Sequence, residues 1–158
     1  MSPFPEPNEQ NLYLVEHVQL LRESLKRSVK RDLIDPTLPA VAAAQVIFEA
    51  PFVVVSHDTA SDPIFNYANQ TALTLFEMTW SEFTSLPSRQ SAEPPNQAER
   101  AQLLGQVSTQ GYVDGYSGVR WSKTGRRFRI EQVTIWNLVN PRGDYQGQAA
   151  IYSHWTYL

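Results

Sequence analysis

The sequence predicts an α+β fold: a five-stranded antiparallel sheet with short helices on one face, preceded by an N-terminal helical extension. Helical periodicity fills residues 9–49, and two short strands and several short helices follow. Three long strands joined by tight turns close the chain, which is an order typical of an antiparallel sheet and not of alternating strand–helix–strand units. The length of 158 residues suits one domain with a core large enough to enclose a cavity.

The N-terminal region predicts two helices behind a leader. Residues 1–8 contain three prolines, which block helical and ladder hydrogen bonds, so a flexible leader is expected there. A helix is predicted from Glu9 to Leu33, because apolar residues recur at intervals of three and four and must be buried against a sheet or a partner helix. Asp35-Pro36 ends this segment, and a second helix is predicted from Pro39 to Glu49.

The middle of the chain predicts short elements. Phe52–Val55 is a predicted buried strand, and Ile64–Asn69 is a second one. A short helix is expected over Gln70–Phe76, and Thr79 with Glu82 three residues later matches a capping box. A longer helix is predicted from Gln97 to Thr109, with Gly111 as the residue that ends it.

The C-terminal half predicts three strands in a meander. They cover Tyr112–Ser122, Arg126–Val139 and Tyr145–Tyr157. Lys123–Gly125 and Asn140–Asp144 form the connecting turns, both of which carry glycine. Together with the two earlier strands they make the five strands of the predicted sheet.

Several of these segments resemble known families. Residues 64–76, Ile-Phe-Asn-Tyr-Ala-Asn-Gln-Thr-Ala-Leu-Thr-Leu-Phe, resemble the stretch of a PAS domain in which a strand ends in Tyr-Ala-Asn and a helix follows. Residues 122–136 and 153–157, with 56–59 and 62–63, are similar to the MEKHLA family, a PAS-like group. That family forms the C-terminal part of plant class III homeodomain–leucine-zipper transcription factors. It also occurs as stand-alone bacterial proteins, which are the type that this chain resembles.

The resemblance covers Phe48 to Leu158, so a PAS-like domain is expected over 48–158 and a helical extension over 9–47. It implies a non-enzymatic sensory or regulatory module. The literal Met-Glu-Lys-His-Leu-Ala string is absent, and no segment looks like a homeodomain or a long zipper. The DNA binding of the plant proteins is therefore not expected to transfer.

Composition narrows the classes of partner. Thirteen Lys and Arg against sixteen Asp and Glu give a net charge of -3, which argues against a nucleic-acid partner. No apolar run approaches the roughly 20 residues of a membrane span, and no signal peptide is visible, so a cytoplasmic protein without a membrane partner is expected. The absence of cysteine excludes thiolate metal sites, thiol nucleophiles and cysteinyl–flavin adducts.

Strand alternation locates a candidate cavity. Without a bulge, the even-numbered residues from Phe128 to Trp136 share one face, and Val133 and Ile135 lie on the other. Because both faces of the sheet carry apolar residues, both must be covered. We expect the short helices to cover one face and the N-terminal helix or a second subunit to cover the other. A homodimer through that helix or the sheet face is therefore expected. The candidate ligand-binding residues are Asn66, Tyr67, Asn69, Phe128, Gln132, Thr134, Trp136 and Gln148. The competing interpretation is that local hydrogen bonds satisfy their polar groups.

Two alternatives to a ligand-binding sensor stay open. One is a small enzyme that uses His57 with Asp58, Asp62 or Asp114, although the consecutive Ser56-His57-Asp58 cannot form a triad alone because neighbours on a strand alternate faces. The other is an interaction scaffold with a filled core.

Cofactor and charge patterns give three further expectations. The histidines, His17, His57 and His154, show no metal-ligand spacing, so neither a metal site nor haem is expected. The cofactor stays unspecified, with Asn66, Asn69, Gln132 and Gln148 as amide candidates for a non-covalent flavin. Lys123, Arg126, Arg127 and Arg129 form either an anion-docking hairpin or a solvated strand end, and Arg89 is expected to pair with Glu93 or Glu99.

Overall fold

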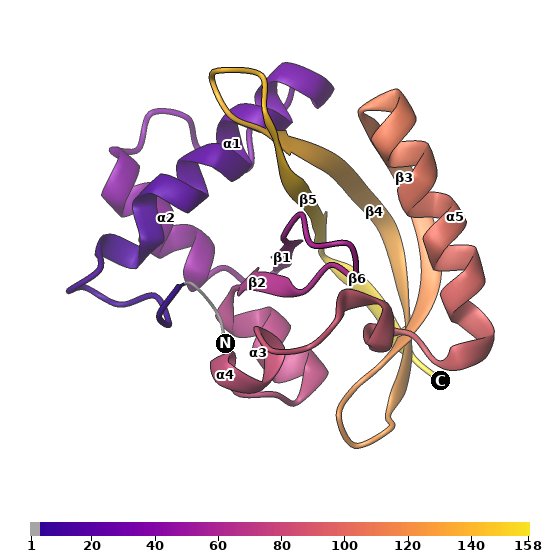
Figure 1. The fold of residues 1–158 in the computed structure, drawn as a ribbon. Coiled ribbons are helices and arrows are strands. Elements are labelled where there is room, and N and C mark those ends of the chain that lie inside the picture. Colours follow the sequence, from indigo (N-terminus) through magenta and orange to yellow (C-terminus); the bar gives the residue numbers. More distant parts are fainter. Residues whose placement is uncertain (1–3) are drawn as a thin grey trace.

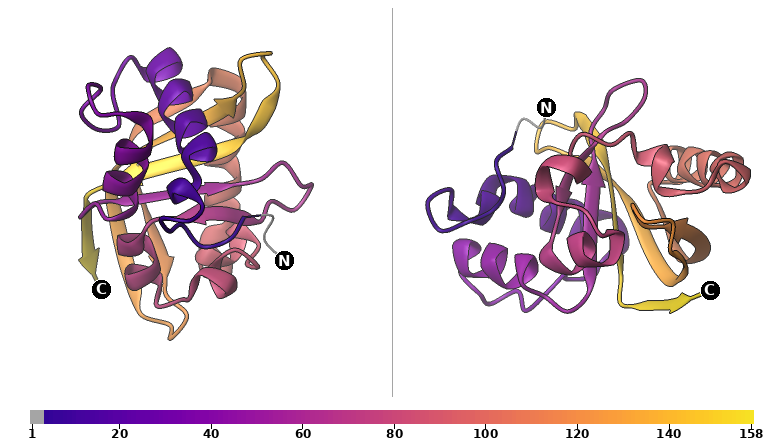
Figure 2. Two further views of the ribbon diagram at one scale, coloured as in Figure 1. Left: turned by 90° about the vertical axis from the view of Figure 1, so that its left-hand side faces the viewer. Right: turned by 90° about the horizontal axis from the view of Figure 1, so that it is seen from below.

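A computed structural model describes residues 4–158 and confirms the α+β fold class (Figure 1). The sheet is antiparallel, with strand order β2-β1-β5-β4-β3, and β6 also pairs with β4. Two helices, α1 and α2, cover one face, whereas α5 and the short helices lie on the opposite side (Figure 2). Within residues 4–158, no helix combines the length and apolar character needed to cross a membrane.

The helices are η1 (Leu12–Leu14), α1 (Val15–Val29), α2 (Ala40–Phe48), α3 (Gln70–Phe76), α4 (Trp80–Phe83), η2 (Ser88–Ser91) and α5 (Pro94–Gln110). The strands are β1 (Val53–His57), β2 (Phe65–Ala68), β3 (Tyr112–Trp121), β4 (Arg127–Val139), β5 (Tyr145–Tyr152) and β6 (His154–Tyr157). The predicted capping box is confirmed, since Thr79 and Glu82 bond each other's backbone at the start of α4. Gly111 ends α5 as predicted.

The first predicted helix is shorter than expected. Leu12, Tyr13 and Leu14 have φ between 53° and 55°, a left-handed conformation that interrupts a right-handed helix, so α1 begins only at Val15. Lys30 is also left-handed and ends the helix, and its N–H donates to the carbonyl of Lys26.

The residues before η1 lie against the fold. Residues 1–3 of the predicted flexible leader lie outside the described residues. The carbonyl of Phe4 accepts a hydrogen bond from the indole of Trp80 at 3.0 Å, and Pro7 is buried. The Phe4 ring lies 5.0 Å from the ring of His17. The stretch from Phe4 to Pro7 is therefore held by α1 and α4.

The last predicted strand is divided at Ser153, which gives six strands instead of five. β5 pairs with β1 and with the second half of β4, whereas β6 pairs with the first half of β4. At the same level, Gln132 has φ 54° and the register between β3 and β4 shifts. This irregularity places two residues between the buried Ile130 and Val133, so the alternation changes parity.

The predicted face assignment is therefore wrong beyond Glu131. Val133 and Ile135 join Phe128 and Ile130 in the core cluster beneath α5. Trp136 belongs instead to the cluster beneath α1.

Two hydrophobic clusters lie on the two sides of the sheet. The first packs β4 and β1 against α3, α4 and α5, and includes Phe76, Phe83, Leu103 and Val107. The second buries the stripe of α1, namely Val18, Leu21 and Leu25, together with Ile47 of α2. The stripe of the N-terminal helix is thus covered by the sheet of its own chain.

Candidate functional site

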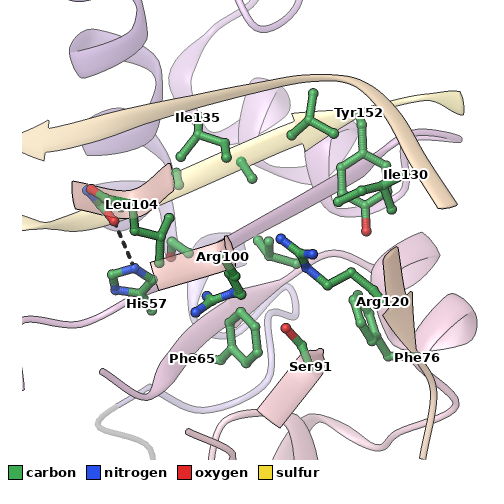
Figure 3. Close-up of a pocket in the computed structure, with 16 residues that line it drawn as sticks. His57, Phe65, Phe76, Ser91, Arg100, Leu104, Arg120, Ile130, Ile135 and Tyr152 are labelled. Atoms are coloured by element: carbon green, nitrogen blue, oxygen red, sulfur yellow. Dashed lines mark hydrogen bonds between the residues drawn. The ribbon is translucent and has the colours of Figure 1, made fainter. Parts of the chain in front are cut away.

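A cavity of about 60 Å³ lies between the sheet, α5 and η2 (Figure 3). Most of its wall is apolar, formed by residues that include Val55, Phe65, Phe76, Leu104, Ile130, Val133 and Ile135. Its polar groups come from His57, Ser91, Arg100, Arg120, Gln148 and Tyr152. A largely apolar cavity with a few placed polar groups is the usual design of a small-molecule site. The core beneath α5 is therefore not completely filled by side chains.

Two buried arginines face this cavity. Arg100 on α5 is 7% exposed and Arg120 on β3 is 6% exposed. Among residues 4–158, no carboxylate oxygen lies within 4.0 Å of either guanidinium, since the ion pairs there involve other cations. Arg100 also has no hydrogen-bond partner within these residues. Burial, followed by the charge of Arg120, lowers the pKa of Arg100 to about 9.

Arg120 is held in place by Tyr116 and Gly118. One Arg120 nitrogen donates to the carbonyl of Val119 at 2.8 Å, and another donates to the Tyr116 hydroxyl at 3.2 Å. That hydroxyl donates in turn to Glu99 at 2.9 Å. A Cβ atom at Gly118 would overlap the Tyr116 hydroxyl, so the glycine is what lets Tyr116 fold back over its own strand.

The hydroxyl of Tyr152 is a further polar group that faces the cavity. It is buried and has no hydrogen bond within residues 4–158. Burial raises the pKa of Tyr152 above its ordinary value, so the neutral hydroxyl is available to donate. Figure 3 shows this hydroxyl on the same side of the cavity as Arg120.

His57 and Gln148 also line the cavity. The Nε2 of His57 lies 3.2 Å from Oε1 of Gln148, and its Nδ1 lies 2.9 Å from the carbonyl of Asp58. Gln148 donates its amide nitrogen to three acceptors, which come from Leu104, Ser108 and Asn137. Burial is the main cause that lowers the pKa of His57 and keeps the ring neutral, and the charge of Arg100 acts in the same direction.

The sequence-predicted ligand residues are spread over both sides of the sheet. Gln148 lines the cavity, and Phe128 lies in the core cluster on the same side. Gln132 is exposed at the bulge. Thr134 donates to Asp114 at 2.7 Å, and the indole of Trp136 donates to the carbonyl of Leu21 at 3.2 Å, beneath α1.

The three remaining candidates lie near the edge strand. Asn69 caps α3 and also bonds Val54, Ile47 and Phe52, so its amide is fully used inside the chain. Asn66 accepts a hydrogen bond from Ser56 at 2.6 Å. Tyr67 packs against the rings of His17 and Trp80 on the α1 side.

Sequence reasoning missed Arg100, Arg120 and Tyr152. A signal for one of them was present, because Arg100 shares an apolar helical stripe with Leu103, Leu104 and Val107. A cation on a buried stripe indicates a function or a partner.

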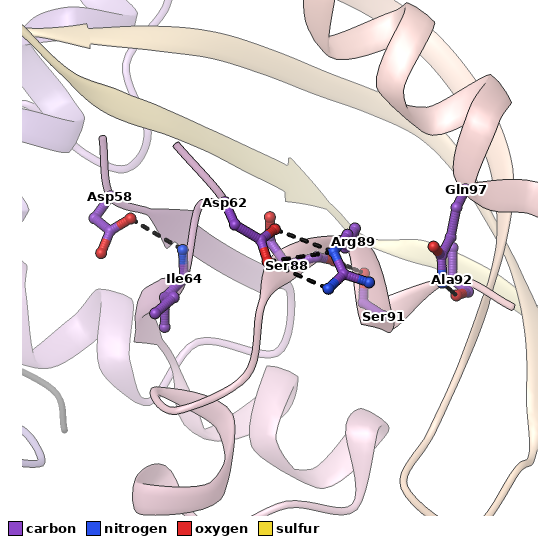
Figure 4. A network of polar contacts seen from close by, with 8 residues as sticks. All are labelled: Asp58, Asp62, Ile64, Ser88, Arg89, Ser91, Ala92 and Gln97. Carbon is purple, nitrogen blue, oxygen red and sulfur yellow. Dashed lines mark hydrogen bonds and ion pairs between the residues drawn. The ribbon is translucent and has the colours of Figure 1, made fainter. Parts of the chain in front are cut away.

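The enzyme hypothesis requires a carboxylate beside His57 in the cavity. None of the residues that line the cavity carries a carboxylate. Figure 4 shows two of the carboxylates named for an enzyme in the neighbouring loop network. Asp58 accepts the N–H of Ile64 at 3.0 Å, and Asp62 pairs with Arg89 at 3.1 Å. Asp114 accepts from Thr134 on the other side of the sheet. The histidine–carboxylate pair of the enzyme hypothesis is therefore not formed.

The predicted partners of Arg89 were wrong. Arg89 pairs with Asp62, whereas Glu93 pairs with Arg127 and Glu99 accepts from Tyr116. In the same network Ser91 donates to the carbonyl of Ser88, and Gln97 donates to that of Ala92 (Figure 4). These contacts hold η2, whose Ser91 lines the cavity.

The basic hairpin is mostly engaged within the chain. Lys123 pairs with Glu82, and the guanidinium of Arg126 lies 3.5 Å from the ring centroid of Tyr157. Since Arg127 pairs with Glu93, the exposed Arg129 is the one cation of the predicted cluster that has no ion-pair or hydrogen-bond partner for its side chain among residues 4–158.

The cavity was also compared with the needs of a metal or a flavin. No group of three metal-ligating side chains occurs within residues 4–158. Of the four amides proposed for a flavin, only Gln148 lines the cavity, and a volume of about 60 Å³ does not admit a three-ring system. The residues present therefore do not fit a flavin.

Comparison with known proteins adds the family. The model of the MEKHLA domain matches residues 15–157. The homeobox-leucine zipper protein ATHB-14 of Arabidopsis thaliana is 25% identical over 100 residues, which are 63% of this chain and 12% of that protein. The chain thus spans only a small part of this curated relative.

Solved structures show the same fold. A PAS domain from Colwellia psychrerythraea matches with a TM-score of 0.61 and 16% identity, covering 74% of this chain and 94% of that one. A light-oxygen-voltage domain from work on a flavin analogue matches at 0.59 and 18% identity, covering 74% and 84%. An RNA-binding light-oxygen-voltage receptor matches at 0.61 and 18% identity, covering 75% and 34%. The chain has a PAS-like fold, and it belongs to the MEKHLA domain family.

Proposed function

We propose that this chain is a non-enzymatic sensory module that binds a small molecule in the cavity beneath α5. One observation carries the proposal: a largely apolar cavity contains polar side chains that the chain itself leaves without partners. Buried polar groups without partners cost free energy, and proteins keep few of them unless a function requires it. A bound molecule that supplies these partners offsets the cost.

The sheet connects this cavity to the N-terminal helices. Ser56 and His57 of β1 both line the cavity, and the hydroxyl of Ser56 also lies 2.9 Å from Nε2 of His17 on α1. A ligand that shifts β1 therefore also moves the residues of β1 against which α1 packs. Such coupling transmits a signal only if the ligand binds two arrangements of the helix with different affinity.

Native mass spectrometry of the full-length chain, purified without denaturation, tests this function. We expect a mass excess that disappears when the protein is denatured. The variant Ala150→Leu narrows the cavity and is expected to lose the excess mass, whereas Val46→Leu, at an exposed position on α2, keeps it. Unchanged far-ultraviolet circular dichroism controls for folding. Identical masses before and after denaturation, together with no binding from a fragment panel, would refute the function.

We also propose self-association through the N-terminal helices as a second candidate. The apolar stripe of α1 is used within the chain, but Leu12, Val41 and Val46 of η1 and α2 are exposed apolar residues. Light scattering of the wild type and of Val46→Lys measures the oligomeric state directly. Dimers lost in the variant support the proposal, and a wild-type monomer at high concentration contradicts it. A cytoplasmic location and the absence of a nucleic-acid partner stay predictions.

A further inference from the structure

We infer that the ligand is a small monocarboxylate whose anionic group lies between Arg100 and Arg120, with the Tyr152 hydroxyl as a third contact. This inference rests on the proposed function and specifies its ligand.

The charge of the cavity supports an anion. Two buried guanidinium groups face one space, and Glu99, which accepts a hydrogen bond from Tyr116, forms an ion pair with neither of them. Placing two cations in a poorly solvated site without a counter-charge is unfavourable, and charge-assisted hydrogen bonds to an anion reverse that penalty. Burial, followed by the charge of Arg120, lowers the pKa of Arg100 by more than the charges of Tyr116 and Glu99 raise it, so the acidic groups nearby compensate the buried charge only in part.

The two arginines are the only cations that line the cavity within residues 4–158. His57 is neutral because burial, and to a smaller extent the charge of Arg100, lower its pKa, so a second anionic group has no further cation to meet. The apolar wall includes Leu104, Val133 and Ile135. A molecule with one charged end and an aliphatic body matches this distribution, whereas inorganic phosphate leaves the apolar wall unused.

The size of the cavity limits the length of the ligand. A volume of about 60 Å³ corresponds to roughly four to six water positions at about 10–15 Å³ each. A carboxylate with a similar number of non-hydrogen atoms, from acetate to butyrate, fits this space without rearrangement of the fold.

Protein-observed nuclear magnetic resonance of the full-length chain tests the inference. Butyrate is titrated against butyramide, a neutral molecule of nearly the same shape, and against inorganic phosphate. We expect butyrate to shift the amide signals of cavity residues and butyramide to bind about 10- to 100-fold more weakly, because the hydrogen bonds to arginine lose their charge assistance. Arg100→Gln and Arg120→Gln are expected to weaken butyrate by a similar factor, and the exposed Arg129→Gln serves as the charge-matched control.

The outcomes separate the inference from the function on which it rests. Equal binding of butyramide in the cavity overturns the anionic ligand and leaves the small-molecule sensor standing. Binding of phosphate without butyrate overturns the monocarboxylate. No cavity shifts with any of the three compounds overturns the monocarboxylate as well, and native mass spectrometry then decides the broader function. If an arginine variant fails to fold, the comparison of butyrate with butyramide on the wild type still decides the inference.

Discussion

Acidification below pH 6.5 is expected to destabilise the fold through His17. This residue of α1 is 8% exposed, and burial lowers its pKa to about 4. Its Nε2 lies 2.9 Å from the hydroxyl of Ser56, which itself donates to Asn66. His17 therefore donates to Ser56 as a neutral ring. The neighbouring rings of Phe4 and Tyr67 offer no countercharge to an imidazolium.

The pKa values give the size and the sign of the effect. An unfolded histidine takes up its proton near pH 6.5, whereas folded His17 does so only near pH 4. Between these values the unfolded state binds more protons, so the free energy of unfolding falls as pH falls. The contribution is complete above pH 6.5 and is lost by about pH 4. The two pKa values differ by about 2.5, and one pKa unit corresponds to about 1.4 kcal/mol, so the free energy of unfolding falls by roughly 3 kcal/mol by pH 4.

Urea denaturation at several pH values between 4 and 7 measures this loss. His57 and the carboxylates also titrate, so the informative quantity is the difference between the wild type and His17→Gln, whose amide still donates to Ser56. We expect the variant to lose about 3 kcal/mol less over this range. Parallel stability curves for the two proteins would show that His17 is not buried as a neutral ring.

Three further substitutions test the cavity and the scaffold. Arg100→Met is expected to stabilise the ligand-free protein by about 1–4 kcal/mol, which thermal unfolding shows as a higher melting temperature. A lower melting temperature would contradict the conclusion that the buried charge of Arg100 is uncompensated. Gly118→Ala is expected to displace Tyr116 and Arg120 and to lower the stability of the fold by about 2 kcal/mol, measured by thermal unfolding. It is also expected to weaken the binding of butyrate at least 10-fold in the nuclear magnetic resonance titration. An unchanged affinity would refute the positioning role of Gly118. Asn69→Ala is expected to cost about 3 kcal/mol in urea denaturation, because the buried backbone groups of Val54 and Ile47 lose their partner; a cost below 1 kcal/mol would mean that water replaces the amide.

Much of the fold could be predicted from the sequence because its signals are local. Pro51 follows the end of α2, and the Thr79–Glu82 capping box forms as predicted. Helix α5 begins at Pro94, three residues before the predicted Gln97, because its two prolines occupy the first turn, where no intrahelical N–H is needed. The limits of α1 could not be predicted in this way, because its start is set by left-handed backbone at residues 12–14 instead of by a proline or glycine.

The candidate site was harder to predict because it depends on the register of a long strand. One left-handed residue, Gln132, reverses the direction of every side chain after it, so Thr134 and Trp136 face α1 and Val133 faces the cavity. Alternation alone carries no signal for such a bulge. Tyr152 and Arg120 come from β5 and β3, and only the order of strands in the sheet brings them together.

The most direct test of the cavity as a carboxylate site is contact between ligand and protein atoms. Intermolecular nuclear Overhauser effects can be recorded between butyrate and chain labelled at its Ile, Leu and Val methyl groups. We expect effects from the terminal methyl of butyrate to Leu104, Val133 and Ile135, lost in Arg120→Gln at the same ligand concentration. Effects only to exposed methyl groups such as those of Val41, or none at saturating butyrate, would contradict the proposed site.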